Sequence, residues 1–192
     1  MWPDRVKLQL NFDVEKMKCD VRLLDSIEWV SHFVKQNYLG DWSIIPLRGP
    51  AHATHPILMS HSNPGCNEIT DTPYLQNLNY IPKVLNTFMC PLLSVRLMKL
   101  TAGSEIKRHI DYDLSVEMGT VRLHIPIITH NKVTFWVNDK VVPCNAGECW
   151  YLRLSDPHYV TNESDIDRVH LVLDVTVNAW LERMLYSAQH GH

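Results

Sequence analysis

The chain has 192 residues, of which 45% are hydrophobic and 20% charged, and its formal net charge is -3. This length and composition are typical of a globular domain with a sizeable core; they exclude a disordered polymer, a collagen-like fibre and a repeat array. The slightly negative charge argues against nucleic acid as a partner, because proteins that bind it usually present a basic face. No linker-like stretch divides the chain, so we expect one domain over residues 1–192.

The chain shows no sign of secretion or membrane insertion. Its first residues contain no apolar segment typical of a signal peptide, and no apolar run approaches the roughly 20 residues that cross a bilayer. The five cysteines are an odd number without CxxC spacing, which argues against a disulfide framework. We expect a cytoplasmic protein with no membrane span. The sequence does not indicate its oligomeric state.

The N-terminal part reads as helical. Apolar residues recur at steps of three and four between residues 14 and 38, most clearly from Leu23 to Val34. Residues 40–74 are rich in proline and glycine, which predicts loops and short strands. We expect the helices to pack on a β-structured core.

The core is expected over residues 93–178, where short apolar runs are separated by Gly, Asn, Asp and Pro. The predicted strands are 94–100, 121–128, 132–137, 147–154, 158–161 and 168–177, and residues 177–185 read as a closing helix. Strands without intervening helices favour an antiparallel sandwich or barrel over a βαβ fold. The chain is therefore predicted to be mainly β.

Two of these strands alternate between apolar and polar residues. Arg122 and His124 lie on the polar face of VRLHIPI, and Arg168 lies on the polar face of RVHLVLDVTV. Alternation alone favours the usual antiparallel arrangement, in which the polar face meets water. The alternative places these three side chains inside a barrel mouth, where they would bind an anion.

A pattern of three potential metal ligands and one arginine points to chemistry. His109 and Asp111 form an H-x-D, His158 follows at the head of a predicted strand, and Arg168 lies ten residues further on. An iron(II) oxygenase site uses two histidines and one carboxylate, and leaves coordination positions open. Side chains at i and i+2 of an extended segment project alike, and the arginine fork binds a carboxylate in a bidentate manner.

Three segments carry a family resemblance: GSEIKRHIDYDL, VRLHIPIITH and AGECWYLRLSDPHYVTNESDIDRVHLVLDVTVNAWL. Together they resemble the aspartyl/asparaginyl β-hydroxylase family of 2-oxoglutarate- and iron(II)-dependent oxygenases. GDWSIIPLR, near the N-terminus, is more weakly similar. The resemblance implies a double-stranded β-helix, which is a jelly-roll, cupin-like core, here with N-terminal helices packed on it.

The resemblance also implies roles for individual residues. His109, Asp111 and His158 would be the Fe(II) ligands, and Arg168 would bind the distal carboxylate of 2-oxoglutarate. Arg122 and His124 match family positions that contact the cosubstrate or a substrate carboxylate. With O2, such an enzyme hydroxylates an unactivated C–H and releases succinate and CO2.

The chain departs from the animal peptide hydroxylases of this family at two positions. They lack the acidic ligand, whereas Asp111 is present here, as in the bacterial members. They also carry a cosubstrate-binding serine on the strand before the first ligand, where this chain has Met98. The second contact to the distal carboxylate is therefore not identified from the sequence.

The expected substrate is an amino acid or an amino-acid-like molecule bearing a carboxylate, and a peptide side chain stays open. Candidate substrate residues are Arg122, Arg96, Trp42 and Arg48, although Arg96 would equally suit a solvent-facing position and Trp42 and Arg48 a structural one. The alternative function is a non-catalytic, cupin-type protein that binds a metal or small molecule. Production of succinate distinguishes the two.

Other titratable residues are weaker candidates. His52, His55 and His61, with Cys66, would form a second metal site only with an unusual ligand spacing. Asp113 is an alternative acidic ligand, but at i+4 from His109 on an extended segment it lies too far away.

Overall fold

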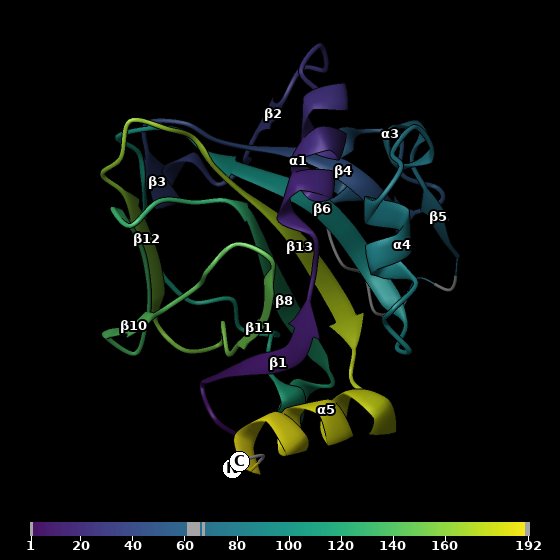
Figure 1. Ribbon diagram of the computed structural model, residues 1–192, viewed down its shortest axis with the longest axis vertical. Helices are drawn as coiled ribbons and strands as arrows, with labels where there is room; N and C mark the ends of the chain where they lie inside the picture. The colour runs from purple at the N-terminus through teal and green to yellow at the C-terminus, as the bar shows by residue number, and fades with distance from the viewer. Residues whose placement is uncertain (1, 61–65, 67, 191–192) are drawn as a thin grey trace.

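The computed structural model describes residues 2–60, 66 and 68–190. Two antiparallel β-sheets are stacked against each other, and helices cover the outer face of the larger sheet (Figure 1). The chain is thus mainly β, as the sequence predicted.

The larger sheet has eight strands in the described part of the chain. Seven follow the order β1 (Arg5–Asn11), β11 (Glu148–Leu152), β8 (Thr120–Ile128), β13 (Arg168–Thr176), β6 (Leu92–Leu100), β4 (Trp42–Pro50) and β2 (Val30–Ser31), and β5 (Ile69–Asp71) pairs with β4. The smaller sheet follows the order β10 (Lys140–Val142), β9 (Val133–Val137), β12 (His158–Asn162), β7 (Glu105–His109) and β3 (Tyr38–Leu39). All pairings are antiparallel.

The helices are short except at the two ends of the chain. They are α1 (Val14–Leu23), α2 (Pro56–Met59), α3 (Pro73–Gln76), α4 (Ile81–Leu85) and α5 (Ala179–His190), with single 3₁₀ turns at Lys35–Asn37 and Val116–Met118. Asp13 caps α1 by accepting a hydrogen bond from the Lys16 backbone N–H at 3.1 Å. Prolines occupy the first turns of α2, α3 and α4, where a missing N–H breaks no helical hydrogen bond.

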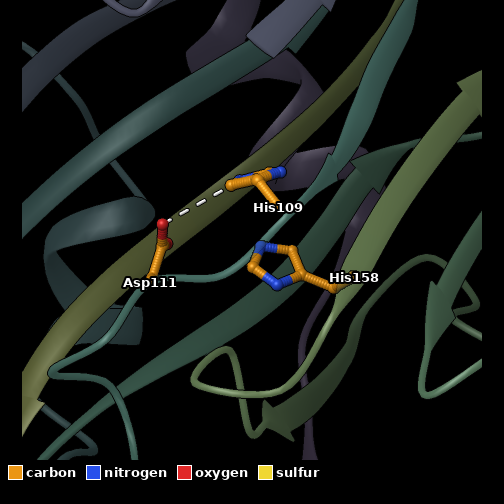
Figure 2. A group of neighbouring side chains, drawn as sticks. All are labelled: His109, Asp111 and His158. Carbon is orange, nitrogen blue, oxygen red and sulfur yellow. Dashed lines mark ion pairs between the residues drawn. The ribbon is translucent and has the colours of Figure 1, made fainter.

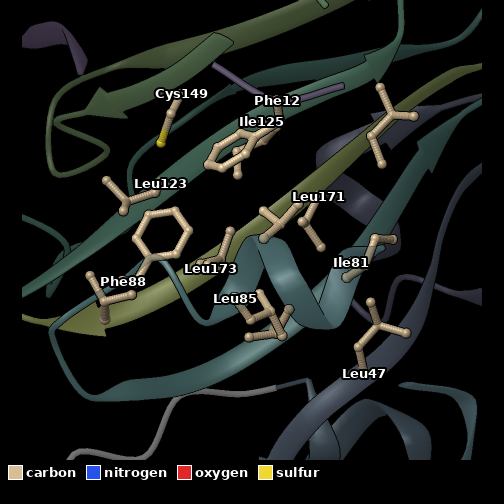
Figure 3. Close-up of a cluster of buried hydrophobic side chains, with 14 of the residues drawn as sticks. Phe12, Leu47, Ile81, Leu85, Phe88, Leu123, Ile125, Cys149, Leu171 and Leu173 are labelled. Carbon is tan, nitrogen blue, oxygen red and sulfur yellow. The ribbon is translucent and has the colours of Figure 1, made fainter. Parts of the chain in front are cut away.

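The larger sheet is buried on both faces. Leu123 of β8 and Leu171 of β13 point outward and pack with Ile81 and Leu85 of α4 (Figure 3). The opposite face packs against the smaller sheet in a second cluster, which includes Trp42, Met98, Phe135 and Val172. The polar face of β8 and β13 therefore points between the sheets, and the interpretation that it meets water is wrong. Alternation cannot distinguish a face covered by water from one covered by a second sheet.

The strands predicted in the C-terminal half are present, with bounds that differ by one or two residues. The N-terminal half differs more. The helix predicted over 14–38 ends at Leu23, because the segment beyond it pairs as β2 with Ser43 and Ile44 at the edge of the larger sheet. Residues 40–74, predicted as loops and short strands, contain the nine-residue strand β4, which accommodates Pro46 next to a shift in register. Strand β1 was not predicted.

No helix in the described ranges has the length and hydrophobicity needed to cross a membrane.

Candidate active site

Two strands of the smaller sheet bring the three potential metal ligands together. His109 ends β7, His158 begins β12, and the two are cross-strand partners. Asp111 follows β7, and its backbone N–H donates to the Leu154 carbonyl at 2.8 Å. One ligand atom from each of the three side chains lies within 4.8 Å of the others (Figure 2). Within the described residues this is the one cluster that could hold a metal ion.

Both histidines are oriented for metal binding. Nδ1 of His109 lies 2.7 Å from the Lys107 carbonyl, and Nδ1 of His158 lies 3.0 Å from the Asp156 carbonyl. A carbonyl only accepts, so Nδ1 carries a proton in both rings and Nε2 is the nitrogen that can bind a metal. Burial, with help from His109, lowers the pKa of His158 to about 4, which keeps its ring neutral. Two neutral imidazoles and one carboxylate are the donor set of non-haem iron(II) sites.

A narrow cavity of about 30 Å³ leads from these ligands into the space between the sheets. It is lined by Arg168, His124, Met98 and Phe135, together with the three potential ligands. Arg168 is 2% exposed and contacts no carboxylate in the described part of the chain; its Nε has no hydrogen-bond partner there. Burial lowers the pKa of Arg168 to about 10.

His124 is a further buried polar group that lines this cavity. Neither ring nitrogen forms a hydrogen bond within the described residues. Burial and the nearby Arg168 hold the pKa of His124 well below its usual range, so the ring is neutral. Buried polar groups are normally satisfied, so an arginine without a carboxylate partner beside a histidine without hydrogen bonds indicates a binding site for an anionic ligand.

Met98 lies where the family resemblance calls for a serine. It is buried, lines the inner cavity, and its cross-strand partner is His170. His170 contacts Arg168, with 2.8 Å between the ring Nδ1 and the guanidinium Nη2. Because Arg168 donates, His170 keeps Nδ1 unprotonated. Burial and Arg168 hold its pKa well below the usual range.

Arg122 is paired with two carboxylates, in contrast to Arg168. Its Nε and Nη2 donate to the two oxygens of Asp174 at 2.6 and 3.0 Å, and its Nη1 donates to Oδ2 of Asp111 at 2.7 Å. Although burial opposes it, these carboxylates raise the pKa of Arg122. Arg96 binds Asp174 from the other side.

An outer cavity of about 350 Å³ opens on the other side of the potential ligands. Its walls include His109, Asp111, Arg122, Trp42 and Asp113, and the two cavities share the first four of these. Trp42 stacks on His32 with 3.6 Å between ring centroids. The outer cavity therefore offers an aromatic wall next to the potential metal site.

Two candidate substrate residues lie away from the cavities. Arg48 lines neither of them, because its guanidinium pairs with Asp71 of the neighbouring strand β5. Arg96 is buried behind Asp174 and does not point into solvent. Asp113 is exposed, lines the outer cavity, and is not part of the ligand cluster.

The histidines of the proline-rich segment form no metal cluster in the described part of the chain. Nδ1 of His55 accepts the Ile57 backbone N–H and caps α2, and His52 lies 3.9 Å from the Cys66 sulfur. His61 falls outside the described residues.

Sequence reasoning missed two parts of this region. It gave Asp174 no role, although a charged residue within a long apolar strand signals a buried ion pair. It also missed His32, whose contact with Trp42 depends on the unpredicted pairing of β2 with β4.

Two stacked antiparallel sheets that enclose a His-Asp-His cluster and a buried arginine define a double-stranded β-helix of the cupin and oxygenase type. The family model described as aspartyl/asparaginyl β-hydroxylase matches residues 34–177. The chain belongs to this family.

A curated relative and two solved structures extend the comparison. The L-proline cis-4-hydroxylase of Rhizobium meliloti (strain 1021) is 26% identical over 184 residues, which cover 94% of this chain and 64% of the relative. The chain thus spans less than two thirds of that protein.

Both structures are similar in fold alone. An oxidoreductase of the 2OG-Fe(II) oxygenase family from Burkholderia pseudomallei has a TM-score of 0.56 at 12% identity, covering 90% of this chain and 85% of that one. A prolyl-4-hydroxylase from Pseudomonas putida has a TM-score of 0.52 at 11% identity, covering 92% and 94%.

Proposed function

We propose that the protein is a 2-oxoglutarate- and Fe(II)-dependent dioxygenase that hydroxylates an unactivated C–H of an amino acid or amino-acid-like substrate, with release of succinate and CO2. The observation that carries this proposal is Arg168. It is a buried guanidinium without a carboxylate partner in the described residues, in a cavity that also contains His109, Asp111 and His158.

The metal would be held by His109, Asp111 and His158. Their hydrogen bonds engage Nδ1 and leave both histidine Nε2 atoms available to a metal, and the Asp111 carboxylate supplies the one negative charge. This set prefers a divalent first-row metal and leaves positions open for other ligands. When bound, Fe(II) and 2-oxoglutarate supply the oxygen-activating chemistry that converts a C–H bond into an alcohol.

The cosubstrate would extend from Arg168 to the metal ligands. A guanidinium binds a carboxylate with two parallel hydrogen bonds. When the guanidinium is buried, the bound carboxylate also compensates its positive charge. The inner cavity is narrow, at about 30 Å³, so a five-carbon dicarboxylate must also use the space where the two cavities meet. His124 would donate to the same ligand, since both of its nitrogens lack partners among the described residues.

The substrate would occupy the outer cavity. Its volume of about 350 Å³ suits a small molecule. Arg122 has five N–H donors and uses three in its contacts with carboxylates, so it retains donors for a substrate carboxylate. Asp113 forms no ion pair within the described residues and would face an ammonium group. The relative named as a proline hydroxylase supports a free amino acid.

The test is a panel of free amino acids, beginning with L-proline, and of the same molecules with the amine or the carboxylate blocked, along with short peptides. Each is incubated with Fe(II), ascorbate, 2-oxoglutarate and O2. We expect substrate-stimulated succinate together with a mass gain of one oxygen, and loss of turnover when either end of the amino acid is blocked.

His158→Ala serves as the control that keeps the cavity but removes a metal ligand. Metal and 2-oxoglutarate binding without succinate across the whole panel would instead support the non-catalytic, cupin-type function. Turnover of peptides but not of free amino acids would keep the chemistry and change the substrate.

A further inference from the structure

A carboxylate lies at the centre of strand β13, outside both cavities. Asp174 is 0% exposed and is flanked by an arginine on each neighbouring strand. Arg122 is its cross-strand partner on β8, and Arg96 lies two residues from its partner Ser94 on β6. Asp174 has no role in the proposed function as stated above.

The contact between Asp174 and Arg122 fixes the direction of the guanidinium. Nε donates to Oδ1 at 2.6 Å and Nη2 donates to Oδ2 at 3.0 Å, which is the two-point geometry that holds a guanidinium in one plane. The remaining nitrogen, Nη1, then points at Asp111 and donates to its Oδ2 at 2.7 Å.

The orientation of the Asp111 side chain depends on this hydrogen bond from Arg122. It lies beyond the end of β7, is half-buried, and its side chain has no hydrogen bond except the one from Arg122 in the described part of the chain. With Oδ2 occupied by Arg122, Oδ1 is turned toward the ligand cluster, 3.9 Å from Nε2 of His109 (Figure 2). Arg122 thus binds Oδ2 of Asp111 and leaves Oδ1 available to a metal.

We propose that Asp174 is a positioning residue, which orients Arg122 so that Arg122 holds Asp111 by one oxygen and presents the other to a metal. This role rests on the proposed function. Without Asp174, the Arg122 fork is free to take both oxygens of Asp111, as guanidinium–carboxylate pairs prefer, and would compete with the metal.

The charges around Asp174 support this arrangement. Although burial opposes it, Arg122 and Arg96 hold the pKa of Asp174 well below its usual range, so the carboxylate stays ionised. Two arginines and two aspartates balance in charge, and the network is neutral before a metal arrives. Neutralising Asp174 would leave an excess positive charge close to a site for a cation.

Arg96 provides a matched control. It binds the same carboxylate, with Nη1 3.2 Å from Oδ2 and Nη2 3.4 Å from Oδ1, but it does not contact Asp111. If Asp174 served only to hold the strands together, Asp174→Asn and Arg96→Met would weaken metal binding to the same degree. If Asp174 acts through Arg122, Asp174→Asn weakens metal binding and Arg96→Met does not.

The experiment titrates Co(II) into the metal-free protein and follows its visible absorption, a readout that does not depend on turnover. Binding to the wild type must be removed by Asp111→Ala. We expect Asp174→Asn to bind Co(II) about 10- to 100-fold more weakly, the range for residues that orient metal ligands. Arg96→Met should stay within about twofold of the wild type.

A double-variant cycle tests whether Asp174 acts through Arg122. In an Arg122→Met background, Asp174→Asn should cause a much smaller loss of Co(II) affinity than in the wild type, because the residue that orients Asp111 is gone and only the loss of one negative charge remains. Additive losses would overturn the proposal. Circular dichroism checks folding, and if Asp174→Asn does not fold, Arg122→Lys compared with Arg96→Lys decides in its place, since a single ammonium cannot hold both carboxylates.

The outcomes separate the two proposals. A wild type that binds no Co(II) at Asp111 would overturn the proposed function and, with it, the role of Asp174. A wild type that binds Co(II), with Asp174→Asn unchanged or weakened to the same degree as Arg96→Met, would overturn the role of Asp174 alone.

Discussion

Two arginines project from neighbouring strands into the space between the sheets, and their surroundings are opposite. Arg122 of β8 contacts the carboxylates of Asp174 and Asp111. Arg168 of β13 contacts a neutral histidine and no carboxylate within the described residues. Burial acts on both, yet the pKa of Arg122 is raised by its partners while that of Arg168 falls to about 10.

The difference teaches how one residue type serves two tasks in one cavity. A buried cation that is already paired gains less from a further anion than an unpaired one does, and it is well suited to orient its partners. A buried cation without a partner gains a full charge interaction when an anionic ligand arrives. We therefore propose that the end of the cavity near Arg168 binds the anionic ligand, and that Arg122 at the other end positions a metal ligand.

The largest effect is expected where the positioning end meets the metal. His109→Ala or Asp111→Ala should reduce substrate-coupled succinate formation to the level of the metal-free protein, because either change removes one of only three protein ligands. Succinate and hydroxylated product are measured together. Full turnover by both variants would show that the metal is held elsewhere.

At the binding end, Arg168→Met should raise the dissociation constant for 2-oxoglutarate by at least about 30-fold, since losing one member of a buried charge pair costs about 2–5 kcal/mol. Binding is measured by calorimetry with the metal-loaded protein without O2. The ligand-free variant should be no less stable than the wild type, because the change removes an unpaired buried charge. An unchanged dissociation constant would move the cosubstrate carboxylate to another residue.

The same substitution at the paired arginine should act in the opposite direction on stability. Arg122→Met leaves Asp111 and Asp174 without their main partner, which should lower the free energy of unfolding by about 3 kcal/mol. This is the lower end of the usual range, because Asp174 keeps Arg96. Urea unfolding of both methionine variants, free of ligands, measures the contrast. Equal losses from the two would contradict the distinction between paired and unpaired arginines.

The two buried histidines near Arg168 should also make the stability of the fold depend on pH. His124 and His170 have pKa values well below normal because of burial and Arg168, so the unfolded chain binds protons that the folded chain rejects. The free energy of unfolding should therefore be at its highest above about pH 6.5, the ordinary pKa of histidine. On acidification below that pH it should fall by about 1.4 kcal/mol per pH unit for each histidine.

Urea unfolding at several pH values in EDTA measures this slope. His170→Gln keeps an acceptor for Arg168 but does not titrate, and it should remove about 1.4 kcal/mol per pH unit from the slope below pH 6. Arg122→Met does not alter the histidines' own burial and serves as the comparison. A slope identical in wild type and His170→Gln would exclude a titration of His170 on unfolding.

Much of the site could be predicted because it depends on spacing along strands. His109 and Asp111 lie two residues apart, and His109 and His158 meet as cross-strand partners, so the ligand cluster follows from local geometry plus one pairing. Six of the C-terminal strands were equally readable from their apolar runs, whereas β7 and β10 were not predicted. The domain bounds of 1–192 and the individual residue roles stay predictions.

What could not be predicted depends on which surfaces meet. The network of Arg122 and Asp174 requires the register of β8 against β13, and no pattern within either strand contains it. The sequence did not distinguish Arg48 from Trp42 as candidate substrate residues. In the structure a shift in register at Pro46 lies between them; Trp42 lines the cavities, whereas Arg48 pairs with Asp71. The helix predicted beyond Leu23 failed because pairing with β4 overrode a helical pattern.

The smallest effect is expected from returning a hydroxyl to the binding end. Met98→Ser places an O–H donor on the wall of the inner cavity, opposite His170 in the sheet and close to where Arg168 would hold the distal carboxylate. One added hydrogen bond is worth about 0.5–1.5 kcal/mol, so the dissociation constant for 2-oxoglutarate should fall about two- to tenfold. Met98→Ala is the control that makes the same space without the hydroxyl. Tighter binding by the serine variant alone would place the carboxylate beside position 98, whereas equal changes in both would mean that added space, and not a donor, limits binding at this end.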